Sequence, residues 1–186
     1  MTSTWTVGLI ADTHIPDRVR TLRPEVQRIF TRAGVCCILH AGDVVAAGVL
    51  KQLARIAPVY AVRGNRDLAL LRLPLKRALP IGPFTVGLIH GHGTLSRYVR
   101  DKMGYLLGQP ILFRRFVERA RAAFPAADVV VFGHIHYPMV RRFGRQWVIN
   151  PGSPVGNDLS PVPPSVGLLH LREGRGPQPE LVFLTR

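Results

Sequence analysis

Two histidines that follow an apolar run have a spacing that would let them meet at one point. Residues 129–132 are all apolar and three of them are β-branched, which is typical of a buried strand. Gly133 ends this run, and His134 and His136 follow it at positions i and i+2. Side chains two residues apart in an extended chain point the same way, so both imidazoles can face the sheet edge where α/β proteins bind ligands. From this stretch alone, two solvated loop histidines are an equal alternative.

The same pattern recurs at four further predicted strand ends. Apolar runs at residues 6–11, 36–40, 58–62 and 85–89 are each followed closely by polar side chains of the kinds that bind metal ions. The candidate ligands collected in this way are Asp12, His14, Asp43, Asn65, His90, His134 and His136. Oxygen and nitrogen donors without a thiolate suit Mn²⁺, Fe, Zn²⁺, Ni²⁺ or Co²⁺ better than Ca²⁺. Seven donors exceed what one catalytic ion with an open position needs, and they suit two ions that share a carboxylate.

The elements between these strand ends predict an α/β fold. Helical patterns over residues 23–33 and 46–56 alternate with the first three strands, which implies right-handed crossovers and a parallel sheet. Residues 79–84 are predicted to form a turn that leads into the strand at 85–89. The later strands are predicted as two hairpins, Met139–Phe143 with Gln146–Asn150 and Ser165–Leu171 with Glu180–Leu184. We therefore expect a second, largely antiparallel sheet packed on the first, within a single domain of residues 1–186.

A mostly helical segment is predicted between residues 95 and 123, divided by Gly104, Gly108 and Pro110. The second part of this segment has an apolar face, and arginines lie on the opposite face. These arginines are Arg114, Arg115, Arg119 and Arg121. We expect them to be solvated and to serve solubility or a partner surface rather than the chemistry.

Taken in order, the five strand-end motifs resemble those of the calcineurin-like metallophosphoesterase superfamily. They are Asp12-Thr13-His14, Gly42-Asp43, Gly64-Asn65-Arg66-Asp67, His90-Gly91-His92 and Gly133-His134-Ile135-His136. The short chain, Ile15-Pro16 and Asn150-Pro151-Gly152-Ser153 resemble the small single-domain branch, which holds prokaryotic phosphodiesterases and a partner-binding retromer subunit. The resemblance implies a four-layer αββα sandwich, in which two mixed β-sheets are flanked by helices.

The resemblance also implies how the ligands divide between two divalent ions. One ion would be held by Asp12, His14, Asp43 and His136, and the other by Asp43, Asn65, His90 and His134. Asp43 would bridge the two. We expect Mn²⁺, with Ni²⁺, Fe, Zn²⁺, Co²⁺ or Mg²⁺ as alternatives. The implied reaction is hydrolysis of a phosphoester by a hydroxide held between the two ions.

One position departs from the family pattern. Many phosphatases of the superfamily have a histidine after the asparagine of the third motif, where this chain has Arg66. Arginine is no acid near neutral pH, but its fork can bind phosphate oxygens, so we expect Arg66 to contact substrate. His92 is then the first candidate for the acid, and a role in orienting a ligand is the equal alternative. We expect Asp67 to orient Arg66 or to cap the next turn, and Asn150 and Ser153 to support the ligands by hydrogen bonds.

Composition limits the environment and the partners of the protein. Lys and Arg number 25 against 11 Asp and Glu, and the resulting net charge of +14 attracts phosphate esters, nucleic acid or anionic lipid. Hydrophobic residues make up 47% of the chain, too many for a disordered protein, and no apolar run is long enough for a membrane span. Cys36 and Cys37 are adjacent and offer no disulfide framework, so we expect a reducing, cytoplasmic location.

These observations predict a metal-dependent phosphoesterase, most simply a phosphodiesterase that acts on a small phosphoester. A non-catalytic, partner-binding scaffold of the same fold is the first alternative, although none of the seven candidate ligands is missing. A nuclease is the second alternative. The net charge favours it, whereas the sequence has no recognisable nucleic-acid-binding module or aromatic stacking platform. The sequence leaves the substrate, and the choice between a monomer and a homo-oligomer, open.

Overall fold

The first sheet combines three parallel strands from the start of the chain with a hairpin from its end. The computed structural model describes residues 3–70, 72–107, 113–156 and 162–185. Strands β1 (Thr4–Ile10), β2 (Cys37–His40) and β3 (Val59–Ala61) are parallel neighbours. The hairpin of β9 (Ser165–Arg172) and β10 (Gly176–Phe183) joins them beside β1, which gives the order β10-β9-β1-β2-β3. The carboxyl ends of β1, β2 and β3 therefore meet at one edge, as the sequence predicts.

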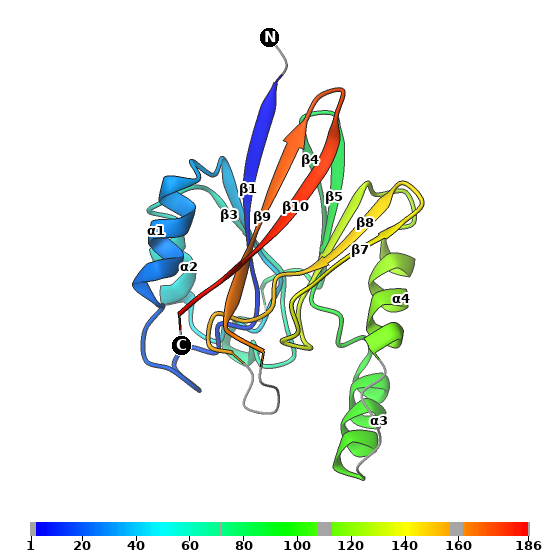
Figure 1. Cartoon of the computed structure of the whole chain (residues 1–186). Helices are drawn as coiled ribbons and strands as arrows, with labels where there is room; N and C mark the ends of the chain where they lie inside the picture. Colours follow the sequence, from blue (N-terminus) through cyan, green and yellow to red (C-terminus); the bar gives the residue numbers. More distant parts are fainter. Residues whose placement is uncertain (1–2, 71, 108–112, 157–161, 186) are drawn as a thin grey trace.

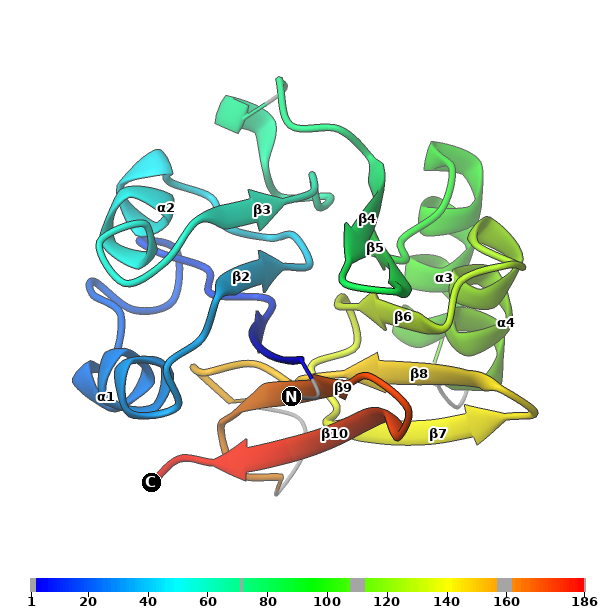
Figure 2. The same cartoon turned by 90° about the horizontal axis from the view of Figure 1, so that it is seen from above.

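Two helices connect the parallel strands and cover the outer face of this sheet (Figure 2). Helix α1 (Pro24–Arg32) has a proline in its first turn, where the missing N–H costs nothing, and an arginine in its last turn. Val26 and Phe30, one turn apart, are its buried residues. Helix α2 (Ala47–Leu53) buries Val49 and Leu53 in the same way. Both helices lie within the ranges predicted from the sequence.

The second sheet is parallel at its centre and antiparallel at both edges. Its order is β4-β5-β6-β8-β7. The strands are β4 (Lys76–Ile81), β5 (Phe84–Ile89), β6 (Val129–Phe132), β7 (Met139–Phe143) and β8 (Gln146–Asn150). β5, β6 and β8 run parallel, whereas β4 pairs antiparallel with β5 and β7 antiparallel with β8. The largely antiparallel sheet predicted for the second half is thus wrong at its centre.

One predicted turn is also wrong. Residues 79–81 belong to β4, and only Gly82 and Pro83 form the turn into β5. β4 is an edge strand, so Pro80, which lacks an N–H, is tolerated in it. Its side chains alternate between exposed and partly buried, with basic residues at the start. Because of the proline and the charges, this segment lacks the apolar run by which the other strands were predicted.

The segment between β5 and β6 holds two helices, α3 (Leu95–Leu106) and α4 (Phe113–Ala123). Helix α4 packs on the second sheet through Phe116, Val117 and Ala120, the apolar face that the sequence predicts. In Figure 1, α3 lies beyond α4 at the end of the molecule toward which β1 runs. A 3₁₀ turn, Leu68–Leu70, follows β3.

Three layers of apolar contacts hold the four structural layers together. The middle layer lies between the two sheets and includes Leu9, Leu39, Leu88 and Val131. The two outer layers lie between the first sheet and α1 with α2, and between the second sheet and α4. Figures 1 and 2 show the resulting order of helices, sheet, sheet and helices. The predicted αββα sandwich is confirmed, and no helix among the described residues is long and apolar enough to cross a membrane.

Candidate metal centre

The candidate ligands leave the strands on strained backbone. Six non-glycine residues among those described have left-handed φ angles, and five of them are candidate ligands. Their φ angles are 54° at Asp12, 46° at His14, 53° at Asp43, 75° at His134 and 51° at His136. Each such conformation costs about 1–3 kcal/mol and is typical of functional sites. His134 and His136 thus reach the sheet edge through left-handed turns, and not through the extended loop that their spacing suggested.

Two glycines of the motifs allow the loops to approach each other. A Cβ atom at Gly64 would lie 2.1 Å from Oδ1 of Asp43 and 2.4 Å from its backbone nitrogen. A Cβ atom at Gly133 would lie 2.7 Å from the carbonyl oxygen of Ala41. Real Cβ atoms do not come so close, so only glycine fits at both positions. The glycines let the side chains of neighbouring loops converge.

One group of donors forms around His14 and His136. Their Nε2 atoms lie 3.0 Å apart, and Oδ1 of Asp12 lies 3.5 Å from Nε2 of His136. Oδ2 of Asp43 lies 3.7 Å from Nε2 of His14. Burial lowers the pKa of His14 to about 2, and the neighbouring His136 adds to this shift. The ring of His14 therefore offers a neutral nitrogen, the form that binds metal ions.

A second group forms around His90. Its Nδ1 lies 2.8 Å from the carbonyl oxygen of Ala41, and its Nε2 lies 3.0 Å from Oδ1 of Asn65 and 3.5 Å from Oδ1 of Asp43. All these partners are hydrogen-bond acceptors, and a neutral imidazole has a single N–H. Burial lowers the pKa of His90 to about 3, so the doubly protonated ring that could satisfy both sides is disfavoured. A cation beside Nε2, with Nδ1–H donated to Ala41, resolves the conflict.

The carboxylates point to the same conclusion. Asp12 and Asp43 are almost fully buried. Burial raises the pKa of Asp43 to about 6, and burial together with the neighbouring Asp43 raises the pKa of Asp12. Two buried carboxylates side by side are unfavourable unless a positive charge compensates them. Asp12, His14 and His136 form one set, and Asp12, Asp43 and His90 another, in which the donor atoms lie within 4.8 Å of each other. These buried Asp and His clusters fit a divalent cation.

Six of the seven candidate ligands are joined by these side-chain distances, and His134 is placed differently. Its ring lies edge-on to the ring of His90, with centroids 5.0 Å apart, and 5.3 Å from the ring of Phe116 on α4. Its backbone N–H donates to both carboxylate oxygens of Asp12, at 2.9 and 3.2 Å. His134 therefore lies at the cluster and also fixes the orientation of Asp12.

Three polar residues outside the set of candidate ligands hold the ligand loops in place. Ser153 donates its hydroxyl to the carbonyl of Asp12 at 2.7 Å, and Asn150 donates its amide to the carbonyl of Gly133 at 2.9 Å. Both give the expected support. The expected role of Asp67 is wrong, because its carboxylate accepts the backbone N–H groups of three residues. These residues are Asp43, Val45 and Gly64.

The two residues named from the sequence for the chemistry have different surroundings. His92 is half-buried, with its ring 5.3 Å from that of His90, and burial lowers its pKa. Arg66 is 51% exposed, and its Nε and Nη2 both donate to Oδ2 of Asp17 at about 3 Å. Only its backbone N–H reaches the cluster, at 2.8 Å from Oδ1 of Asp43. The guanidinium of Arg66 is paired with Asp17 and not with the donors, and its expected contact with substrate stays a prediction.

Sequence reasoning missed Arg119. The expected solvated arginine has a side chain that is only 11% exposed. It donates to the carbonyl of Gly91 at 2.7 Å and to Asp101 on α3 at 2.9 Å. Its guanidinium also lies over the ring of Phe116. Arg119 thus links α4 and α3 to the loop that carries His90 and His92, and no local signal distinguishes it from its exposed neighbours, such as Arg114 and Arg115.

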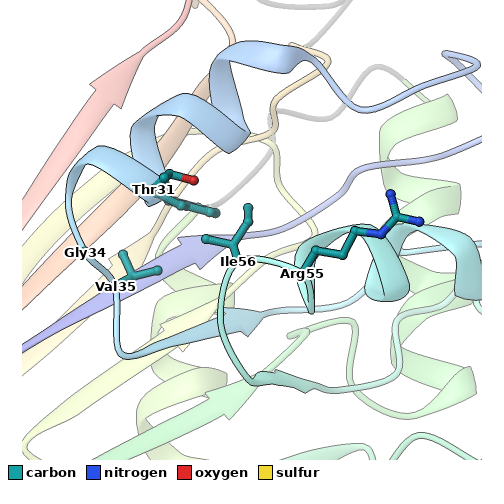
Figure 3. A pocket seen from close by; sticks show the side chains of 6 residues that line it. Thr31, Gly34, Val35, Arg55 and Ile56 are labelled. Atoms are coloured by element: carbon teal, nitrogen blue, oxygen red, sulfur yellow. The ribbon is translucent and has the colours of Figure 1, made fainter.

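A pocket elsewhere on the surface lacks chemistry of this kind. It lies between the ends of α1 and α2 (Figure 3). Its lining residues are Phe30, Thr31, Gly34, Val35, Arg55 and Ile56. They include no carboxylate, imidazole or thiol. The clustered donors at the strand ends are therefore the better candidate for the functional site.

Sequence comparisons agree with the metal centre. Residues 6–174 match the calcineurin-like phosphoesterase superfamily domain. A probable metallophosphoesterase of Methanothermobacter thermautotrophicus is 36% identical over 166 residues, which cover 89% of this chain and 85% of that protein. A probable metallophosphoesterase of Methanocaldococcus jannaschii is 34% identical over 151 residues, which cover 81% of this chain and 69% of that protein.

Solved structures share the fold. The vacuolar protein sorting 29 protein of Cryptosporidium parvum has a TM-score of 0.67 at 21% identity, over 98% of this chain and 99% of that one. A structure described as a novel archaeal phosphodiesterase has a TM-score of 0.67 at 22% identity, over 96% of this chain and 99% of that one. At such identities the likeness concerns the fold alone.

Proposed function

The chain belongs to the calcineurin-like phosphoesterase superfamily, and we propose that it is a metal-dependent phosphodiesterase with two divalent ions at the strand ends. The observation that carries this proposal is His90, a neutral buried imidazole with an acceptor facing each of its two ring nitrogens. Packing alone does not require an acceptor at both ring nitrogens of a neutral imidazole. A cation bound between Nε2 and the oxygens that face it explains why those oxygens lie there.

We assign the bridging position to Asp43. Its Oδ2 faces His14 and its Oδ1 faces His90, so its two oxygens are directed to the two groups of donors. His136 and Asp12 complete the first group, and Asn65 and His134 the second. Asp67 supports this position, because its carboxylate accepts the backbone N–H groups of Asp43 and Val45 in the same loop and of Gly64 in the neighbouring loop. We propose Mn²⁺ as the native ion for this mixed nitrogen and oxygen set.

Two ions held here would supply an activated water and would neutralise charge on the phosphoryl oxygens. The chain's own residues then orient the reacting groups. His134 and Ser153 fix Asp12 through its carboxylate and its carbonyl, which leaves the donor set preorganised before substrate binds. His92 stands beside His90 with its Nδ1 buried and without a hydrogen-bond partner among the described residues. Because burial lowers its pKa, we assign His92 to hydrogen bonding with the substrate or the leaving group as a neutral ring.

The proposed diester preference rests on position 66. A histidine there, as in many phosphatases of the family, could contact a terminal phosphate oxygen of a monoester. In a diester the second ester bond occupies that oxygen. Arg66 instead has its fork on Asp17, so the position offers no imidazole and its cation is already paired. A substrate contact by Arg66 would require its guanidinium to leave Asp17.

The experiment is a metal-dependence assay with a matched histidine control. Protein stripped of metal with EDTA is assayed on aryl phosphate monoesters and diesters, with each divalent ion added in turn. We expect activity to return with Mn²⁺, to favour the diester, and to fall at least about a hundredfold in His90→Ala. His170→Ala is the control, because His170 on β9 is bonded to Thr6 and lies outside the cluster. Turnover that survives metal removal would refute the proposal, and metal binding without turnover would favour a scaffold.

A further inference from the structure

Helix α3 presents apolar side chains to solvent. Val99, Met103 and Leu107 are 49%, 51% and 72% exposed. They are spaced four residues apart, so they form one stripe along α3 and the turn that follows it. A helix that packs on a protein core buries such a stripe instead. We call these three residues the α3 stripe.

The opposite side of α3 is already engaged. Asp101 binds Arg119 of α4 at 2.9 Å, and both side chains are nearly buried. Tyr98, three residues before Asp101 and therefore on the same face, has its ring 6.1 Å from the ring of His134. These contacts fix which side of the helix faces the molecule. The α3 stripe cannot turn inward without breaking the pair of Asp101 and Arg119.

Basic residues border the α3 stripe on both sides. Arg100 follows Val99 by one position and Lys102 precedes Met103 by one, so each lies about 100° around the helix from its stripe neighbour. Arg97 adds a third exposed basic side chain, and the acidic residue of the helix, Asp101, is paired with Arg119. An apolar stripe bordered by Lys and Arg is the pattern of helices that lie in the interface of an anionic bilayer.

We propose that α3 docks the protein on an anionic lipid surface, with the α3 stripe in the acyl boundary and the basic residues at the head groups. A second copy of the chain is a poor occupant, because Arg97, Arg100 and Lys102 would then face the same three residues of the other copy. Each copy also carries a net charge of +14, so the two would repel each other. Nucleic acid would match the charge but would leave the α3 stripe in water. A bilayer accepts a single convex apolar ridge without needing a complementary groove.

The test is co-sedimentation of the intact protein with vesicles of phosphatidylcholine alone and with about a third of the lipid as phosphatidylglycerol. We expect binding to the anionic vesicles, little binding to the neutral ones, and weakening by salt. Val99→Gln/Met103→Gln should weaken binding at least about fivefold, because both side chains enter the apolar boundary. Leu68→Gln/Phe183→Gln is the matched control, since these residues are 77% and 53% exposed elsewhere on the surface. It should bind as the wild type does.

A second pair of variants tests the charge. Arg100→Gln/Lys102→Gln should reduce binding to anionic vesicles, whereas Arg141→Gln/Arg145→Gln, exposed near the β7–β8 turn, should not. Failure of the wild type to bind anionic vesicles would overturn the proposal, as would equal loss in the stripe variant and its control. So would a stripe variant that dissociates an oligomer in size-exclusion chromatography while vesicle binding is unchanged, because the occupant would then be a second copy. The vesicle assay needs no turnover, so its outcome is independent of the proposed phosphodiesterase activity.

Discussion

Left-handed backbone at five candidate ligands concentrates strain where the proposed ions bind. Such conformations persist only when surrounding contacts hold them, and here the contacts come from glycines that admit a neighbouring loop and from buried acceptors such as Asp67. The centre therefore depends on residues that bind no ion. The motif glycines are the sharpest case.

Gly64→Ala tests this dependence. The added Cβ would collide with the side chain and the backbone of Asp43, so that loop must move. We expect a lower melting temperature and an affinity for Mn²⁺ that is weaker by about tenfold or more. Gly48→Ala in α2 is the control, because a Cβ there meets nothing within 4 Å and alanine favours a helix by up to about 1 kcal/mol. Equal effects of the two substitutions would contradict the role given to Gly64.

Asp43→Asn tests the buried charge. Asparagine keeps the shape and the acceptor for the N–H of Arg66, but it removes the charge that would serve both ions, so we expect at least about a hundredfold loss of turnover. Without metal, burial raises the pKa of Asp43 from 3.8 to about 6. Its ionisation therefore lowers the stability of the metal-free wild type as the pH rises from about 4 through 6, and the variant escapes this loss.

Thermal unfolding in EDTA measures this difference. Metal-free Asp43→Asn should melt above the wild type at pH 7, and the two should converge near pH 4. With Mn²⁺ present the order should reverse, because the wild type gains more from the ions. If the variant melts below the wild type at pH 7 in EDTA, other interactions must stabilise the ionised Asp43 carboxylate in the absence of metal, and the prediction is wrong.

Individual elements differ in how well the sequence predicts them. β1, β2, β5 and β6 are buried apolar runs with a polar residue soon after each, so both the strands and the ligand positions can be predicted from the sequence. β4 was missed because it is an edge strand with a proline and a basic start. Arg119 was misplaced because its partners, Gly91 and Asp101, are distant in sequence, and helical periodicity says nothing about such contacts.

Arg119→Gln tests how α4 is joined to its neighbours. It would leave the nearly buried Asp101 without its cation, so we expect a loss of about 3 kcal/mol in the free energy of unfolding. Arg121→Gln is the control, because it replaces another arginine of α4, two positions further on. It removes one hydrogen bond to the neutral Gln146 and a contact with Phe143, and should lower the free energy of unfolding by about 1 kcal/mol. Urea unfolding of both variants measures these values. Similar costs would show that the link to α3 contributes little.

At the scale of the whole molecule, the chain order predicts two packed sheets but not the direction of every strand. Hairpins that are adjacent in sequence suggested an antiparallel second sheet. β5 reaches β6 through α3 and α4, however, and such a crossover returns the chain in the same direction. β8 then pairs with β6 as well as with its hairpin partner β7. Pairing across the sheet is a long-range choice that local patterns do not contain.

The direction of β6 matters for the site. Because β6 runs parallel to β5, His90 and the pair of His134 and His136 leave the second sheet at the same edge. The first sheet presents Asp12, His14 and Asp43 in the same way, and the apolar layer between the sheets holds the two edges together. The centre is therefore a property of the whole sandwich, since each sheet alone supplies only part of the donor set.

The number and position of the bound ions test the proposed metal centre most directly. Crystals of the protein grown with excess Mn²⁺, and measured for anomalous scattering at the manganese edge, would locate them. We predict two ions less than about 5 Å apart, with Asp43 contacting both. One ion at saturating Mn²⁺, or two ions without Asp43 between them, would contradict it.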